Sequence, residues 1–145
     1  MSDLSVALAE GKLNIRVAAW CEVEGKLLVC HYQDQTITLP GGRVKFGEST
    51  VEALTREIKE ELDTTCISID YLGVIENLFE QKVAYHELLF VYTVELAEKN
   101  RFKQTQTEEF AWIPLTKIQD QLVPQALVHL KKTPKTHMIN KESSF

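Results

Sequence analysis

The stretch "GGRVKFGESTVEALTREIKEELD", residues 41–63, constrains the fold of this 145-residue chain more than any other segment. It opens with two glycines directly after Pro40 and ends in a run of acidic residues. Ser49 and Glu52 stand three residues apart, which is the capping-box pattern found at the start of helices. The segment therefore predicts a helix from about Thr50 to Leu62.

Two adjoining edges of this helix differ in chemistry. At about 100° per residue, four apolar side chains fall within about 80° of one another and are expected to face a core: Val51, Leu54, Ile58 and Leu62. Glu57, Glu60 and Glu61 occupy a neighbouring arc of about 100°. The helix therefore presents three carboxylates beside its apolar edge.

Such bunching needs an explanation, because like charges four residues apart destabilise an exposed helix by roughly a few tenths of a kcal/mol. Arg56, four residues from both Glu52 and Glu60, offsets part of the repulsion. Taken alone, the helix reads as a solvated acidic face with one salt bridge. Gly41 and Gly42 favour a second interpretation, since glycine lets the backbone approach a ligand closely. Carbonyl and carboxylate oxygens together are the ligands that Mg²⁺ binds.

The same stretch resembles the Nudix box, the signature of a family of hydrolases. The matching positions are Gly42, Glu48, Arg56, Glu57, Ile58, Glu60 and Glu61. Their spacing fits without insertion, and the preceding "LPG" is also similar to the usual approach to the box. The chain departs from the pattern at Asp63 and Thr64, where the family has glycine and an aliphatic residue. Asp63 would then end the helix in the left-handed conformation that favours glycine.

The resemblance implies both a fold and an activity. The fold would be α/β (α+β), a Nudix-type α/β/α sandwich with a mixed β-sheet, in a single domain over residues 1–145. The activity would be hydrolysis of a diphosphate bond in a nucleoside diphosphate linked to another group, with Mg²⁺ or Mn²⁺ as cofactor. The substrate class stays open among modified nucleoside triphosphates, nucleotide sugars such as ADP-ribose, and dinucleoside polyphosphates.

The resemblance also assigns roles within the box. The metal ligands and catalytic carboxylates would be Glu57, Glu60 and Glu61, with the carbonyl of Gly41 as a further ligand. Glu57 is in addition the candidate general base. Glu48 would pair with Arg56 beside Gly42 and hold the loop against the helix.

Residues outside the box are harder to assign. In this family an acid from a later loop often assists, and "TQTEEFAW" offers Glu108 and Glu109. His86, at the start of a strand, reads as a phosphate contact or as a simple strand cap. Several aromatic residues are candidates to stack on a base, although most aromatics at strand spacing are core: Trp20, Phe46, Phe79, Phe90, Tyr92 and Trp112.

The rest of the chain alternates between strand and helix patterns. Strands are predicted at residues 14–24, 26–32, 37–40, 66–78, 86–95 and 110–115, and further helices at 116–122 and 124–132. A polar loop is predicted after Gly42, and the polar tail from about residue 133 is expected to be frayed. So many strands with so few helices favour a mixed sheet covered by helices over a doubly wound parallel sheet.

Composition narrows the partners. The net charge is −5, and outside its tail the chain shows no basic face for duplex nucleic acid. No apolar run is long enough for a membrane span, and the N-terminus lacks a secretory pattern. Three widely spaced cysteines, Cys21, Cys30 and Cys66, suit a reducing cytoplasm. We expect a cytoplasmic protein that binds a small nucleotide-type substrate, without a membrane partner, and that has the option of forming a homodimer.

A different class of function is the alternative. Nudix-like domains also serve as sensor modules that bind a nucleotide or metabolite without cutting it. Such a module would tolerate loss of the box carboxylates, and here none is missing. An isomerase acting on a diphosphate has no specific support in the sequence.

Overall fold

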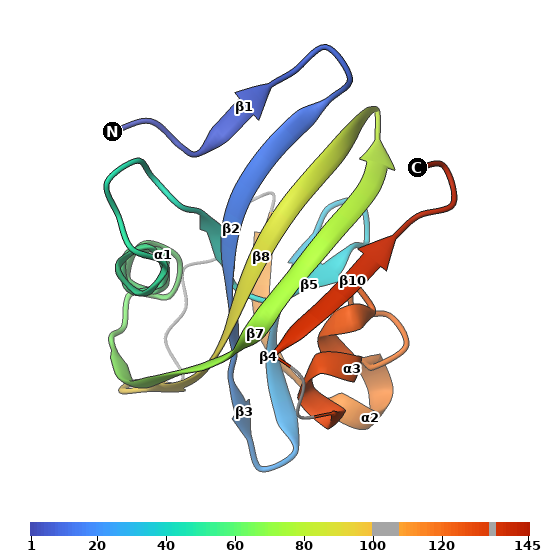
Figure 1. Cartoon of the computed structure of the whole chain (residues 1–145). Coiled ribbons are helices and arrows are strands. Elements are labelled where there is room, and N and C mark those ends of the chain that lie inside the picture. The colour runs from blue at the N-terminus through green and yellow to red at the C-terminus, as the bar shows by residue number, and fades with distance from the viewer. Residues whose placement is uncertain (100–107, 134–135) are drawn as a thin grey trace.

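The computed structural model describes residues 1–99, 108–133 and 136–145, except the side chain of Glu108. The larger of two sheets has the strand order β1-β2-β8-β7-β10, and β6 also pairs with β2. Its strands are β1 (Ser5–Ala7), β2 (Lys12–Trp20), β6 (Gly41–Arg43), β7 (Cys66–Gln81), β8 (Val83–Leu96) and β10 (His137–Lys141). The pairing is mixed, because β2 runs parallel to β8 whereas β7 and β8 form a long antiparallel hairpin (Figure 1).

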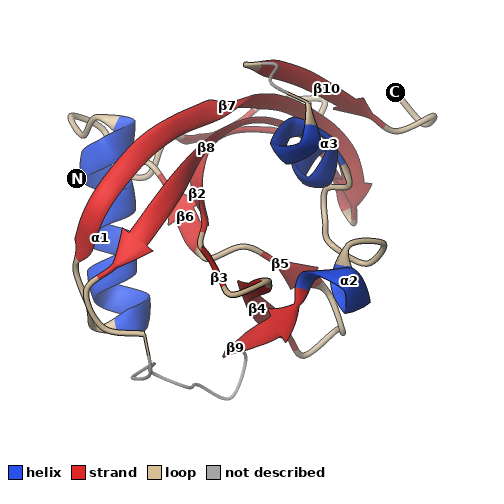
Figure 2. Ribbon diagram, turned by 90° about the horizontal axis from the view of Figure 1, so that it is seen from below, coloured by secondary structure: helices blue, strands red, loops and turns tan. Residues whose placement is uncertain are grey.

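The smaller sheet contains β3 (Glu22–Val23), β4 (Lys26–Tyr32), β5 (Ile37–Thr38) and β9 (Glu108–Pro114). The single strand predicted over residues 14–24 is in fact β2 and β3, which are separated at Cys21 because the chain passes there from one sheet to the other. Helix α1 (Thr50–Leu62) lies on one side of the large sheet. Helices α2 (Leu115–Ile118) and α3 (Ala126–Lys132) lie on the other (Figure 2). The prediction of a mixed sheet with helices on its faces is confirmed.

The two faces of β2 feed two separate cores. Val17 and Ala19 pack with the apolar side chains of α1. Ala18 and Trp20 pack on the opposite side with Leu127 of α3. This alternation follows from the period of two along a strand, and it explains why β2 is apolar at consecutive positions near its end. The sheet is thus covered by a helical layer on each side.

Helix α1 begins and ends as predicted. The Ser49 hydroxyl accepts a hydrogen bond from the backbone N–H of Glu52 at 3.1 Å, and the Glu52 carboxylate accepts one from the Ser49 N–H at 3.2 Å. Asp63 ends the helix in the left-handed region, with φ 52° and ψ 38°. Its N–H donates to the carbonyl of Lys59 at 3.1 Å. Local capping chemistry therefore sets both ends of the helix.

The buried face of α1 is turned from the predicted one. Val51, expected in the apolar stripe, is 42% exposed, whereas Ala53 is fully buried. Relative to the prediction, the helix is therefore rotated about its axis so that the edge that carries Glu57 turns toward the sheet. As a result the Glu57 side chain is only 15% exposed. A helical wheel drawn from the sequence lacks the neighbouring strand that decides this rotation.

Three further segments differ from the prediction. Gly41–Arg43 forms β6 instead of part of a loop, because it pairs with β2. The segment between α2 and α3 is not helical, because Leu122 bridges to Ile37 of β5. Residues His137–Lys141 of the expected frayed tail form β10, which pairs in parallel with the open edge of β7. In the part of the chain that is described, no helix is long and apolar enough to cross a membrane.

Candidate active site

The two box glycines lie where strand β6 is squeezed between β2 and α1. A Cβ atom on Gly41 would come within 2.0 Å of the Val17 carbonyl oxygen. A Cβ atom on Gly42 would come within 2.5 Å of the Glu57 carboxylate. Glycine is therefore needed at both positions, at the first so that β6 can pair with β2, and at the second so that the Glu57 carboxylate can rest on the strand.

Arg56 is the centre of a polar network on the same edge of α1. Its guanidinium donates to both carboxylate oxygens of Glu48, at 2.7 and 2.9 Å. It also donates to Glu57 at 3.0 Å, to Glu60 at 3.3 Å and to the carbonyl of Arg43 at 3.1 Å. The predicted pairing of Glu48 with Arg56 is thus present. The hydrogen bonds from Arg56 lower the pKa of Glu48 to about 2.

Glu57 differs from the other carboxylates in its environment. Burial raises the pKa of Glu57 above its ordinary value, while the hydrogen bond from Arg56 and the positive charge of Arg16 oppose the shift. A carboxylate in a desolvated site binds a proton more readily than one in water. This is the direction of change that suits a general base.

Glu61 and Glu60 complete the carboxylate edge. The backbone N–H of Gly41 donates to Glu61 at 3.1 Å, so this carboxylate lies against the glycine pair. Glu60 is 56% exposed. A cavity lies beside this edge, and we call it the carboxylate cavity; its lining includes Gly41, Gly42, Glu57 and Glu61.

The donor atoms around the carboxylate cavity are of the chemical type that binds a divalent cation. Carboxylates and a glycine backbone are oxygen donors of the type that Mg²⁺ and Mn²⁺ bind. As they are arranged, however, the described residues contain no ready group of three metal-ligating side chains. Arg56 holds one oxygen of Glu57 and one of Glu60, and the second oxygen of each has no partner among the described residues. The network would have to share these carboxylates with a cation.

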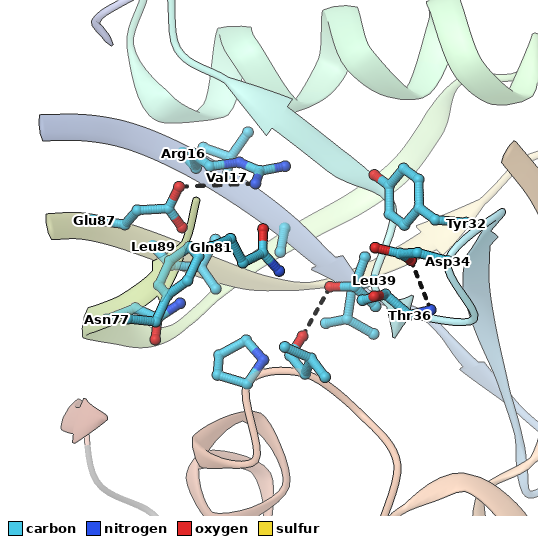
Figure 3. Close-up of a pocket in the computed structure, with 15 residues that line it drawn as sticks. Arg16, Val17, Tyr32, Asp34, Thr36, Leu39, Asn77, Gln81, Glu87 and Leu89 are labelled. Carbon is cyan, nitrogen blue, oxygen red and sulfur yellow. Dashed lines mark hydrogen bonds and ion pairs between the residues drawn. The ribbon is translucent and has the colours of Figure 1, made fainter. Parts of the chain in front are cut away.

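A second cavity, of about 280 Å³, lies between the large sheet and the β4–β5 hairpin, and we call it the intersheet cavity. Its polar lining includes Arg16, Tyr32, Asp34, Asn77 and Glu87, and Figure 3 shows Arg16 and Glu87 on neighbouring strands across from Tyr32 and Asp34. Arg16 and Tyr32 also line the carboxylate cavity. The two cavities therefore adjoin one another at these two side chains.

The polar residues of the intersheet cavity were not foreseen. Three of them stand two positions from a core residue on the same strand face: Arg16 from Ala18, Glu87 from Leu89, and Asn77 from Ile75. A polar residue that continues a core-facing alternation was the signal that the sequence contained. Asn14, in the same series as Arg16, donates to the buried Glu87 at 3.0 Å. Asn77 accepts a hydrogen bond from Asn140 of β10 at 2.8 Å.

Among the described side chains of the acids and aromatics proposed outside the box, Phe79 is the one that lines either cavity. Glu109 is exposed on β9 opposite His31. Glu108 pairs by its backbone with Tyr32, but its side chain lies outside the described part of the chain.

Among the aromatic candidates, Trp20 and Tyr92 are buried in the cores. Phe46 is 65% exposed. Phe79 lines the intersheet cavity. Its ring stacks on Tyr85, with ring centroids 5.0 Å apart. His86 is exposed.

Comparison with known proteins identifies similar sequences and folds. The sequence model described as the NUDIX domain matches residues 12–133. A putative 8-oxo-dGTP diphosphatase, YtkD of Bacillus subtilis, is 32% identical over 85 residues, which cover 59% of this chain and 54% of that protein. The chain thus spans about half the length of this curated relative.

Solved structures agree on the fold. A MutT NUDIX hydrolase from Burkholderia pseudomallei superposes with a TM-score of 0.69 at 21% identity, over 83% of this chain and 98% of that one. A MutT protein from Methanosarcina mazei gives a TM-score of 0.68 at 23% identity, over 86% of this chain and 94% of that one. At these identities the likeness concerns the fold.

Proposed function

This chain belongs to the Nudix family, and we propose that it is a metal-dependent pyrophosphohydrolase that cleaves a diphosphate bond in a nucleotide-type substrate. The observation that carries the proposal is the adjoining pair of cavities. The carboxylate cavity offers oxygen donors and a desolvated base, and the intersheet cavity has room and polar groups for a nucleoside. A substrate that spans both would place its diphosphate beside Glu57.

The box residues would divide the chemistry between them. Glu57, Glu60, Glu61 and the Gly41 carbonyl would hold Mg²⁺ or Mn²⁺, which neutralises phosphate oxygens and lowers the pKa of bound water. Glu57 would take a proton from the attacking water, in line with its raised pKa. Arg56 would keep the carboxylates oriented through its bonds to Glu48 and Glu57. Glu109, or Glu108, stays a candidate for an assisting acid.

The first substrate to test is an oxidised guanine nucleoside triphosphate, 8-oxo-dGTP. The support comes from the B. subtilis relative, whose name gives this nucleotide as its substrate. The volume of the intersheet cavity is close to the lower end of the range for small-molecule sites, roughly 300–1,000 Å³. Nucleotide sugars and dinucleoside polyphosphates are the other classes to include.

A substrate panel with Mg²⁺ tests the proposal. Purified protein is incubated with 8-oxo-dGTP, the common nucleoside triphosphates, ADP-ribose and a dinucleoside polyphosphate, and the nucleoside monophosphate released is quantified. Hydrolysis of at least one class is expected, with loss of activity in EDTA. The Glu57→Gln variant, purified in the same way, controls for a contaminating hydrolase. Tight nucleotide binding by the wild type without cleavage of any compound would favour the sensor module instead.

A further inference from the structure

Arg16 lies at the junction of the two cavities. It belongs to β2, and its side chain lines both the carboxylate cavity and the intersheet cavity. Among the described residues that line the intersheet cavity it is the one cation. Its positive charge reaches Glu57 on one side. On the other side its Nη1 atom lies 3.9 Å from Glu87 (Figure 3).

The protein itself leaves part of the hydrogen-bonding capacity of the Arg16 guanidinium unpaired. Its Nε atom is buried and has no hydrogen-bond partner among the described residues. The 3.9 Å contact with Glu87 is longer than a charge-assisted hydrogen bond, which spans about 2.7–2.9 Å. The side chain as a whole is 35% exposed, so its remaining donors face the cavities. Leaving a buried donor unpaired is unfavourable, and a ligand oxygen that drew the guanidinium toward it would remove this cost.

The surroundings keep this cation in place. Glu87 is only 5% exposed in its side chain and is itself held by the amide of Asn14. The buried carboxylate attracts Arg16 toward the intersheet cavity, while Glu57 attracts it toward the carboxylate cavity. An arginine balanced between two fixed carboxylates suits an anion that passes between the cavities, because its planar fork binds phosphate oxygens in pairs.

We infer that Arg16 binds the phosphate group that joins the nucleoside to the diphosphate bond that is cleaved. The inference rests on the proposed function. Arg16 then acts as a positioning residue: it sets the distance between the nucleoside in the intersheet cavity and the carboxylates of α1. Its contribution should depend on the phosphate and not on the base.

A binding experiment isolates this contact without relying on turnover. Mononucleotides are products of the reaction, so they can be titrated by calorimetry in Mg²⁺ and again in EDTA. The probes are 8-oxo-dGMP, AMP, GMP, CMP and UMP, each compared with its own nucleoside. The proteins are the wild type, Arg16→Gln, Arg16→Lys and the control Lys12→Gln.

Lys12 is the control. It lies on the same strand as Arg16, β2, and is partly buried like Arg16. It lines neither the carboxylate cavity nor the intersheet cavity. Both substitutions to glutamine remove one positive charge from the same strand. A general effect of net charge would appear in both variants.

The expected result is a selective loss. Arg16→Gln should weaken mononucleotide binding by about 10- to 100-fold and leave nucleoside binding unchanged, as for a lost hydrogen bond to a charged group. The mononucleotide affinity of Arg16→Lys should lie between those of the wild type and Arg16→Gln, since lysine keeps the charge but lacks the planar fork of donors. It also provides the measurement if Arg16→Gln does not fold. Lys12→Gln should change both affinities by less than about threefold.

Several outcomes would overturn the inference. Equal losses for nucleoside and mononucleotide would mean that Arg16 only shapes the cavity, and equal losses in Lys12→Gln would mean a general charge effect. Unchanged mononucleotide binding in Arg16→Gln by a protein that does hydrolyse its substrate would remove the inference and leave the proposed function intact. A selective loss in a protein that hydrolyses nothing would keep the phosphate contact and overturn the hydrolase.

Discussion

Arg56 grips Glu48 with two parallel hydrogen bonds, from Nε at 2.7 Å and from Nη2 at 2.9 Å. Glu48 lies in the loop before α1, so this pair ties the loop to the second turn of the helix. The same guanidinium bonds the Arg43 carbonyl at the end of β6. One side chain therefore joins strand, loop and helix around the candidate site.

Replacing Arg56 should destabilise the protein. We expect Arg56→Gln to lower the free energy of unfolding by about 2–3 kcal/mol, because partly buried carboxylates lose their common cation. Urea unfolding at pH 7 measures the change. Lys59→Gln, which removes the exposed ion pair with Asp63, is the control and should cost less than about 1 kcal/mol. Equal stability of the two variants would contradict a structural role for Arg56.

The contribution of Glu48 should depend on pH. Its pKa is lowered from 4.5 to about 2 in the folded protein, so the carboxylate stabilises the fold fully above about pH 4.5 and less as the pH falls toward 2. Wild type should be more stable than Glu48→Gln at pH 7, and the difference should shrink between pH 4.5 and 2. Thermal unfolding across this range measures it. A constant difference would show that the protonated carboxylic acid of Glu48 stabilises the fold as much as the carboxylate does.

Replacing Glu57 should lower the hydrolytic activity and raise the stability of the protein. General-base catalysis contributes roughly 10²–10⁴-fold, so Glu57→Gln should lose at least 10²-fold in single-turnover hydrolysis at saturating Mg²⁺. In EDTA the same variant should be more stable than wild type at pH 7. Burial raises the pKa of Glu57 above 4.5, so ionising the folded protein costs free energy as the pH rises through that range. A near-normal rate would move the base to Glu108 or Glu109.

Divalent metal should bind at the carboxylate edge. We expect Glu60→Gln combined with Glu61→Gln to weaken Mn²⁺ binding at least about tenfold, because both are charged oxygen ligands. Electron paramagnetic resonance of free Mn²⁺ gives the affinities. Glu52→Gln, in the first turn of the same helix, is the control, since glutamine also completes a capping box. The metal site is wrong if the double variant and the control bind Mn²⁺ equally.

The end of α1 should tolerate improvement. Asp63 holds a left-handed conformation at the position where glycine is the usual residue. Asp63→Gly should raise the free energy of unfolding by roughly 0.5–1 kcal/mol, since it removes the steric cost of that conformation. Asp63→Asn, which keeps a residue tolerant of it, should change stability less. A lower stability of the glycine variant would mean that the Lys59 ion pair outweighs the backbone strain.

Sequence alone determined the helix of the site and the order of its carboxylates. The ends of α1 depend on the Ser49–Glu52 capping box and on Asp63, which are contacts within a few residues. The contact between Arg56 and Glu60 depends on helical periodicity. Such local relations repeat wherever the same residues occur, so spacing was enough to predict them.

Only the tertiary structure decided which residues share the intersheet cavity. Asn14 and Glu87 meet because β2 and β8 pair in one register, and a shift by one residue would turn Glu87 away from the cavity. The roll of α1, which buries Glu57, depends in the same way on the strands beneath it. Strand β10 forms because β7 has an edge to pair with. These features depend on pairing between distant segments, and the polar side chains involved carry no local sign of their partners.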